Sequence, residues 1–217
     1  MACERHRFFF QVQQDIRGKV KRMDFIFIIG PSAVGKTTLA KKLYRYYNGV
    51  YLEQSMVHEF IVPDDVDDEG IFEEQLCWEN VLHQLEFFRG KGYRNIISLD
   101  FDDVRAREFP LIFKGYSFII LRLVSSDPEQ IKRQMIHRHN HEGGLYALEQ
   151  IERSSEVIMN RRLLPNEVKI DVAGKSKEEV LKNAIEIIDT YQPLLDYEYK
   201  LDDEHNYLSW VQSRNLN

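Results

Sequence analysis

The sequence predicts an α/β fold in which one parallel sheet is covered by helices on both faces. The prediction rests on three observations. Short apolar runs alternate with longer segments of helical periodicity, which is the order of elements in βαβ units. The first run, 24–29, has no polar alternation, as expected of a strand buried on both faces. It leads directly into a glycine-rich turn and a helical segment.

The predicted strands are the apolar runs of the chain. Right-handed crossovers should join them into one parallel sheet. Ligands of such sheets bind at the carboxyl ends of the strands, so the residues that follow each run are the candidates for a site. The five runs cover 24–29, 50–53, 94–100, 116–124 and 167–172.

The predicted helices begin and end at recognisable caps. The helix after the first strand should end at Asn48-Gly49, which suits a left-handed C-cap. Asp127 should be the N-cap of a later helix, with Pro128 at its first position. A capping box of Ser176 and Glu179 should open the last helix, which runs to about Thr190. Helical spacing also marks 71–89 and the face formed by Leu148, Ile151, Ser155 and Ile158.

Composition and charge limit the classes of protein to consider. The chain has 217 residues, 43% of them apolar, which suits one α/β domain with a small insert. Its formal net charge of −6 argues against a nucleic-acid partner, which usually meets a basic face. No apolar run approaches the roughly 20 residues that cross a membrane. Cys3 and Cys77 stand in no motif, so we expect a reducing, cytoplasmic location and no membrane contact.

We divide the chain into three parts. Residues 1–22 form a basic extension, 23–192 the core and 193–217 a tail. The tail contains several aromatic residues, among them Tyr197 and Tyr199. These could pack on the core, cover a site or join two copies in a homodimer, and packing on the core is the simplest of the three.

The turn after the first strand carries the clearest motif. Residues 30–37 read Gly-Pro-Ser-Ala-Val-Gly-Lys-Thr, which fits G-x-x-x-x-G-K-[ST]. Backbone N–H groups of such a loop point at phosphate oxygens, and the following helix adds the positive end of its dipole. Lys36 should reach the β- and γ-phosphates, and the Thr37 hydroxyl should bind Mg²⁺. We therefore expect ATP with Mg²⁺, contacted by Gly30, Ser32, Ala33, Val34, Gly35, Lys36, Thr37 and Thr38.

Acidic residues follow the second and third predicted strands. Glu53 closes the second strand, Asp100 closes the third, and Asp102 comes two residues later. An Asp at the end of an apolar run can hold Mg²⁺, directly or through water, or accept the proton of an attacking hydroxyl. We expect Asp100 to take this role before Asp102, and Glu53 to contact the acceptor. The alternative is that Asp100 only caps the next turn.

With these motifs, residues 24–191 resemble the small P-loop kinases, which include nucleoside monophosphate kinases, shikimate kinase and chloramphenicol phosphotransferase. The Gly-Pro-Ser start of the loop is common in guanylate kinases. The resemblance implies a three-layer P-loop NTPase fold with five parallel strands in the order 2-3-1-4-5. It also implies a substrate insert at about 54–92 and an arginine-bearing lid at about 133–150.

The resemblance implies further site residues. Arginines that lead into the lid stack on adenine and clamp the transferring phosphoryl group in this family. Arg133 would bind the nucleotide and Arg138 would act in catalysis, although they stand five apart where the family has four. Arg105 and Arg153 would bind the acceptor. The loop after the fifth strand would wrap the adenine through Ala173 and Gly174.

The sequence therefore predicts an ATP- and Mg²⁺-dependent phosphotransferase. Its acceptor would be a nucleotide, a nucleoside or another small hydroxyl metabolite, because no acceptor-specific motif follows Glu53. Two alternatives stay open. One is a regulatory nucleotide-binding module that acts on a protein or nucleic-acid partner through a chain terminus. The other is a kinase of nucleic-acid ends, which the net charge disfavours. The predicted catalytic residues are Lys36, Asp100, Asp102 and Arg138.

Overall fold

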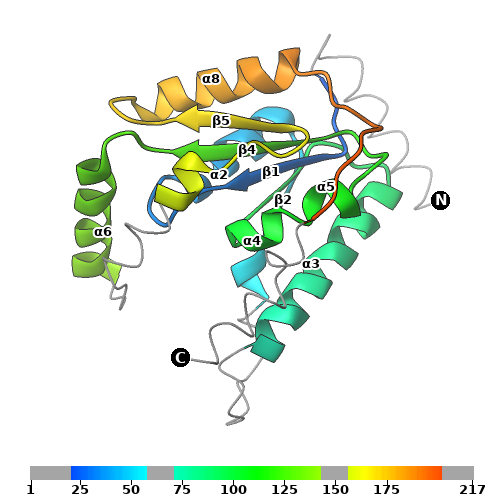
Figure 1. Cartoon of the computed structure of the whole chain (residues 1–217), viewed down its shortest axis with the longest axis horizontal. Coiled ribbons are helices and arrows are strands. Elements are labelled where there is room, and N and C mark those ends of the chain that lie inside the picture. Colours follow the sequence, from blue (N-terminus) through cyan, green and yellow to red (C-terminus); the bar gives the residue numbers. More distant parts are fainter. Residues whose placement is uncertain (1–20, 58–70, 143–155, 202–217) are drawn as a thin grey trace, which may run out of the picture.

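The computed structural model describes residues 21–57, 71–142 and 156–201. A five-stranded sheet with the order β2-β3-β1-β4-β5 crosses its centre (Figure 1). Every pairing between neighbouring strands is parallel. The predicted fold class and strand order are therefore confirmed. The strands are β1 (Phe25–Ile29), β2 (Val50–Glu53), β3 (Ile96–Leu99), β4 (Phe118–Val124) and β5 (Glu167–Asp171).

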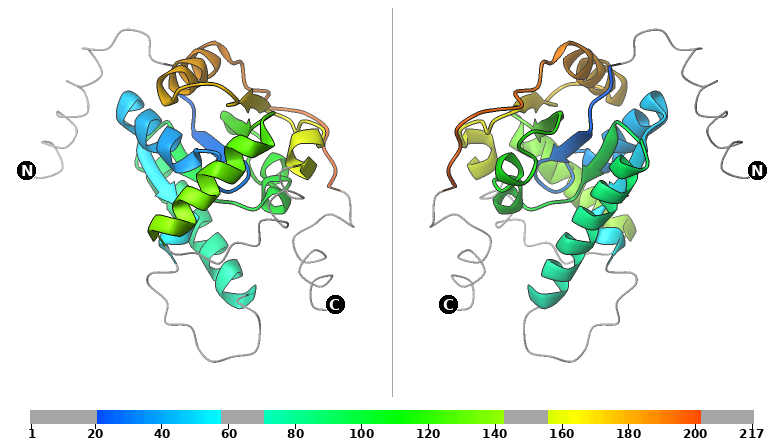
Figure 2. Two further views of the ribbon diagram at one scale, coloured as in Figure 1. Left: turned by 90° about the vertical axis from the view of Figure 1, so that its left-hand side faces the viewer. Right: turned by 90° about the vertical axis from the view of Figure 1, so that its right-hand side faces the viewer.

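Helices cover both faces of this sheet (Figures 1 and 2). Two long helices, α2 and α8, pack side by side on one face, and α3 covers the other face with the short helices α4 and α5. The left view of Figure 2 looks onto the carboxyl ends of the strands, where α6 lies in front of the sheet. None of these described helices is both long and apolar enough to span a bilayer. The helices are α2 (Lys36–Tyr47), α3 (Ile71–Gly90), α4 (Asp103–Ala106), α5 (Phe109–Ile112), α6 (Pro128–Glu142) and α8 (Lys177–Thr190).

The sheet separates two hydrophobic cores, because successive strand residues point to opposite faces. Ile26 and Ile28 of β1 enter the core under α2 and α8. Phe25 and Phe27 enter the other core, where the ring centroid of Phe27 lies 4.4 Å from that of Phe109. Burying one such ring stabilises the fold by roughly 1.5–3 kcal/mol. The unbroken apolar pattern of the first strand thus serves both cores.

The chain between β2 and β3 does not form a wholly separate insert. The sequence predicts a substrate insert over about 54–92. In the structure α3 occupies the second half of this range and packs against the sheet. Cys77, Trp78, Val81 and Leu85 of α3 are at most 3% exposed and belong to the core. Residues 58–70 lie outside the described parts of the chain.

The predicted caps are confirmed. Asn48 ends α2 with a φ of 51°, and its N–H donates to carbonyl groups of the last turn. Asp127 Oδ1 accepts the N–H of Gln130 at 3.2 Å at the start of α6. Ser176 and Glu179 cap the start of α8 reciprocally. These caps depend on local hydrogen bonds, which explains why short sequence patterns locate them.

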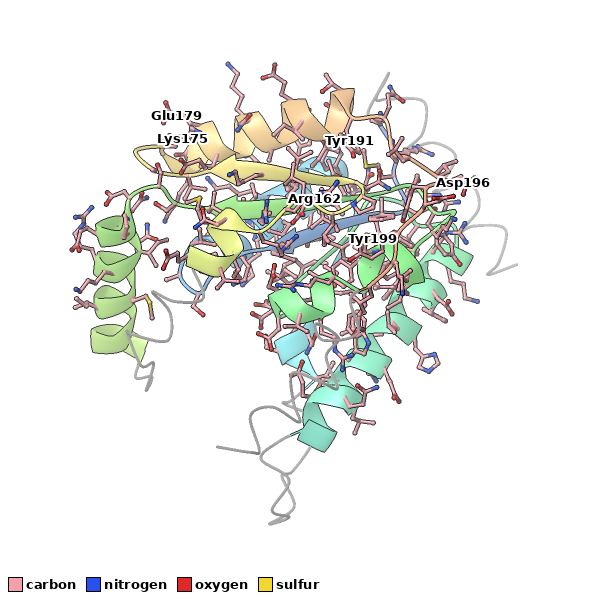
Figure 3. All side chains as sticks on the ribbon, viewed as in Figure 1. Arg162, Lys175, Glu179, Tyr191, Asp196 and Tyr199 are labelled. Atoms are coloured by element: carbon pink, nitrogen blue, oxygen red, sulfur yellow. The ribbon has the colours of Figure 1, made fainter. Side chains whose placement is uncertain are left out.

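The first part of the tail packs on the core. Residues 191–201 run from the end of α8 past α5 toward α4 (Figure 1), and Figure 3 labels Asp196 and Tyr199 on this segment. The Tyr197 hydroxyl donates to the carbonyl of Pro110 at 2.7 Å, and the Tyr199 hydroxyl donates to that of Arg107 at 2.9 Å. The burial that lets Tyr197 join the core also raises its pKa to about 12. Residues 1–20 and 202–217, including the rest of the two predicted terminal parts, lie outside the described chain.

Candidate functional site

The loop between β1 and α2 has the backbone shape of a phosphate cradle. Gly30, Ala33 and Gly35 have φ angles of 144°, 61° and 103°. A side chain at Gly30 would also clash, because its Cβ would lie 2.4 Å from the carbonyl oxygen of Leu123. Gly35 is the N-cap of α2, and no side chain caps that helix start. The N-terminal dipole of α2 is therefore directed at the loop, as anion binding requires.

Lys36 lies across this loop. Its Nζ donates to the carbonyl oxygens of Gly30 at 3.0 Å and Pro31 at 3.1 Å. The ammonium group is therefore held on the concave side of the loop, within reach of a phosphate bound there. Val34, by contrast, is 5% exposed and packs into the core under α2, which anchors the loop to the fold.

A cavity of about 480 Å³ opens beside the loop. It is large enough for a small acceptor beside the terminal phosphates of a nucleotide. The five predicted site residues on its wall are Gly30, Ser32, Lys36, Asp100 and Asp102. The other lining residues come from the loop, η1 (Gln54–Met56), α3, α4 and residues 156–160, which are helical. They are Pro31, Gln54, Ser55, Glu74, Phe101, Asp103, Val104, Arg107, Val157 and Ile158.

A cluster of oxygen atoms adjoins this cavity at the ends of β2 and β3. Thr37 Oγ1 donates to Glu53 Oε1 at 3.2 Å, and the Tyr51 hydroxyl donates to the other oxygen of Glu53. Burial, the bond to Glu53 and the negative charges of Glu53 and Asp100 raise the pKa of Tyr51. Hydroxyl and carboxylate oxygens are the ligands that Mg²⁺ prefers. The sequence analysis assigned Glu53 to the acceptor, but its bond to Thr37 groups it with the residues whose chemistry suits a magnesium ion, namely Thr37, Glu53 and Asp100.

Such an ion would be shared with a nucleotide. Among residues 21–57, 71–142 and 156–201, no group of three or more His, Cys, Asp or Glu side chains is arranged to hold a metal by itself. Magnesium commonly keeps one or two carboxylate ligands and takes others from substrate phosphates. The cluster beside the loop meets this pattern.

The two aspartates differ in their local structure. Asp100 has a φ of 73°, a left-handed conformation that costs a residue with a side chain roughly 1–2 kcal/mol. It ends β3, and its exposed side chain lines the cavity. Asp102, and not Asp100, is the N-cap of α4, yet its carboxylate makes no capping hydrogen bond. Both carboxylates therefore face the cavity, and strain is stored at Asp100, as is common in functional sites.

The structure adds cavity residues that the sequence analysis missed. Gln54 and Ser55 directly follow β2, and their place at the carboxyl end of a strand was the signal that could have found them. Glu74 accepts a hydrogen bond from the Gln54 amide. It lies on α3, and no sequence signal marks it.

Arg107, and not Arg105, lines the cavity. Arg105 is 4% exposed, donates to Glu108 at 3.2 Å and to Gln75, and lies over the ring of Trp78. Arg105 therefore lies in the core under α3 and is not among the described residues that line the cavity, although the resemblance suggests it for the acceptor. The two arginines are two apart on a helical turn, so their side chains point in different directions.

A buried ionic network holds residues 156–162 against α4. Arg161 Nε donates to Asp103 Oδ2 at 2.9 Å, and its terminal nitrogens donate to Glu167 at 2.7 and 3.0 Å. Glu167 also pairs with Arg122, whose side chain is 1% exposed. Burial opposes the charge of Arg161, but hydrogen bonds and charges from Glu167 and Asp103 outweigh it and raise its pKa. The network fixes the wall that carries Val157 and Ile158.

The predicted lid residues do not enter the described cavity wall. Arg133 is largely exposed and donates to Asp127 at 3.3 Å. Arg138 belongs to α6, but its side chain lies outside the described part, as does all of Arg153. Gly174 turns the chain after β5 with a φ of 67°, and Ala173 N–H donates to Asp171. The nucleotide roles of these residues remain predictions.

Comparison with known proteins identifies the fold. No protein-family model and no curated protein matches the sequence. The structure is similar to a gluconokinase from Sinorhizobium meliloti 1021, with a TM-score of 0.54, 14% identity, and coverage of 77% of this chain and 93% of that one. It is also similar to a sugar kinase from a Janibacter species, with a TM-score of 0.52 and 18% identity; the match covers 76% of this chain and 94% of that one. A third similar structure is thymidylate kinase from Candida albicans, with a TM-score of 0.51 and 17% identity; the match covers 78% of this chain and 92% of that one. The chain has the fold of the small P-loop kinases.

Proposed function

We propose that this protein transfers a phosphoryl group from ATP to a hydroxyl group of a small molecule, with Mg²⁺ as cofactor. The observation that carries the proposal is the shared cavity: the phosphate loop, Lys36, Asp100 and Asp102 line one space of about 480 Å³. Kinases with different acceptors share this fold, which supports the reaction class and leaves the acceptor to the site itself.

Each residue has a role that its position supports. The loop and Lys36 would bind the phosphates, and Lys36 would offset the negative charge that develops on the transferring group. Thr37, Glu53 and Asp100 would hold Mg²⁺. An ion held by these residues would supply positive charge to offset part of the negative charge of the phosphates. Asp102 stands further along the same wall and would orient the acceptor hydroxyl and take its proton.

The proposal is tested by acceptor-stimulated release of ADP, with Lys36→Met as the inactive variant. We expect this variant to stay folded and to lose at least about a hundredfold in turnover, because one transition-state contact is worth that much. Lys42→Met is the matched control. It lies on the same helix and removes a surface pair with Glu178, so it should retain full turnover.

The same assay separates the kinase from a regulatory module. A regulatory module would bind ATP and hydrolyse it slowly, with no response to any small acceptor. The cavity beyond the loop favours the kinase, because a module that reads only the nucleotide needs no second space beside the phosphates. Turnover that Lys36→Met leaves intact would contradict both readings of the loop.

A further inference from the structure

We infer that the acceptor is a hydroxyl compound without a phosphate or carboxylate group, either uncharged or bearing an amine, and that Gln54 and Glu74 recognise it. The inference rests on the proposed function and names the substrate class of that site. It follows from the charges and the hydrogen-bonding groups that the cavity presents.

The cavity wall is acidic. Among the lining residues that the structure describes, four carboxylates stand against two cations, a formal net charge of −2. Lys36 sits at the phosphate loop and Asp100 beside the magnesium ligands, so both serve the nucleotide. On the acceptor side, the described lining residues include the acidic Glu74, Asp102 and Asp103 and the basic Arg107. An acceptor that carries its own phosphate would add negative charge to a wall that is already negative, which selects against it.

The cation on that side is already neutralised. Arg107 donates to Asp103 from Nε at 3.4 Å and from its terminal nitrogen at 3.2 Å. Asp103 also forms a salt bridge with Arg161. The charge of Arg107 is therefore already used in a salt bridge with Asp103, and its donors point at that carboxylate and not at a bound anion. Recognition of a phosphate monoester normally uses an arginine whose donors point at the ligand.

The neutral side chain of Gln54 on that side presents an acceptor that needs a hydrogen-bond donor. Gln54 is 3% exposed, and its amide nitrogen donates to Glu74. Its carbonyl oxygen is buried and has no hydrogen-bond partner within the described chain. A buried acceptor without a donor is costly, and a hydroxyl or ammonium group from a ligand would satisfy it. A phosphate or carboxylate has no proton to give there.

Apolar side chains complete the acceptor side. Phe101 lies beside Asp102, and Val157 and Ile158 come from the wall fixed by Arg161. Val157 is 55% exposed although it lines the cavity. These groups would cover the carbon skeleton of an acceptor while the acidic side takes its hydroxyl or amino groups. The wall thus matches a polyol, nucleoside or amino sugar better than a nucleotide.

The test uses matched pairs of probes that differ by an anionic group: thymidine with thymidine monophosphate, guanosine with guanosine monophosphate, and glucosamine with glucosamine 6-phosphate. Phosphoryl transfer from ATP and Mg²⁺ is followed by ADP release and product mass. Binding of each probe is measured by calorimetry with a non-hydrolysable ATP analogue present. We expect the uncharged or amine-bearing member of a pair to be preferred by more than about tenfold.

Variants of the acidic wall complete the test. Glu74→Gln should raise KM for the preferred probe about tenfold while kcat and the KM for ATP stay near their original values, because Glu74 would contact the acceptor and not ATP. Glu74→Asp, which keeps the charge, should recover part of the loss. Glu86→Gln is the matched control, since Glu86 is exposed on the same helix and does not line the cavity. An unchanged acceptor KM in a folded Glu74→Gln would overturn the assignment of Glu74.

The outcomes separate this inference from the proposed function. Preference for the phosphate-bearing member of the pairs overturns the inference and leaves the kinase standing. If ATP binds but no probe is bound or phosphorylated, the inference and the proposed function both fail. Transfer to a neutral or amine-bearing probe that Glu74→Gln weakens supports both.

Discussion

Replacing Glu167 by glutamine should destabilise the protein by about 3–5 kcal/mol, which is the usual cost of removing one partner from a buried ion pair. The side chain of Glu167 is fully buried, with 0% exposure. Glutamine keeps the shape of the side chain but removes its charge. Arg161 would keep its pair with Asp103, which also pairs with Arg107, and buried Arg122 would lose its ion pair with Glu167.

The magnitude follows from the contacts of Glu167. Its two oxygens accept hydrogen bonds from Arg161 at 2.7 and 3.0 Å and from the N–H of Leu164 at 2.6 Å. Hydrogen bonds to charged groups contribute about 1.5–3 kcal/mol each, and glutamine can replace only part of them. Exposures of 1% for Arg122 and 9% for Arg161 leave little water to screen the uncompensated charge.

The assay is denaturant unfolding followed by circular dichroism, with the free energy taken at a constant m-value. Glu178→Gln is the control. The Glu178 side chain is 77% exposed in its pair with Lys42, so this change should leave the denaturant concentration at the midpoint of unfolding unchanged. The double variant Glu167→Gln/Arg122→Met removes one cation together with the anion. It should therefore recover part of the loss.

A loss below about 1 kcal/mol for Glu167→Gln would refute this reasoning. It would mean that the pair is screened by water to the extent of a surface pair, so that the network does not clamp residues 156–162. A double variant that is less stable than Glu167→Gln alone would also contradict the charge argument, because it would show that packing of Arg122 dominates.

Three further predictions follow from other contacts. Gly30→Ala should cost about 2–4 kcal/mol and weaken ATP binding, because its Cβ would meet the Leu123 carbonyl oxygen at 2.4 Å; calorimetry of ATP binding that matched the original protein would rule this out. Burial opposes the charge of Asp24, but hydrogen bonds from Ser117 and the charge of Arg89 outweigh it and lower its pKa below 3.8. The stability that ionised Asp24 contributes is therefore present above about pH 4 and is lost as pH falls through the lowered pKa. The free energies of unfolding of Asp24→Asn and of the original protein should differ at pH 6, and the difference should shrink as the pH falls below 3.8. Tyr199→Phe removes the bond to the Arg107 carbonyl and should lower the free energy of unfolding by denaturant by about 0.5–1.5 kcal/mol. An equal loss from the control Tyr44→Phe, at a residue that is 37% exposed on α2, would contradict the role of the tail.

Local patterns predicted much of the fold. The strand over 24–29, the loop and the helix that ends at Asn48 follow one another within 25 residues, so each determines the next through short-range contacts. The capping box of Ser176 and Glu179 is local in the same way. Asp100 and Asp102 could be predicted because the end of a parallel strand is a binding position in any sheet of this kind.

Contacts between distant segments could not be predicted in this way. The sequence analysis chose Arg105 for the acceptor, but the orientation of a four-residue helix decides which of two neighbouring arginines faces the cavity. Glu74 reaches Gln54 from another element. Arg161 is bound by Asp103, 58 residues away, and by Glu167. Pairing of this kind depends on how elements pack, and a single sequence carries no local trace of it.

By itself, the sequence determined the class of fold, the phosphate loop and the two aspartates at the end of β3, because hydrophobic periodicity and turn chemistry act over a few residues. The tertiary structure decided which residues face the cavity beside that loop. Side chains from η1, α3, α4 and residues 156–160 meet there only after the sheet has brought their elements together. The charge of the acceptor wall is the sum of these distant contributions, so it exists only in the folded protein.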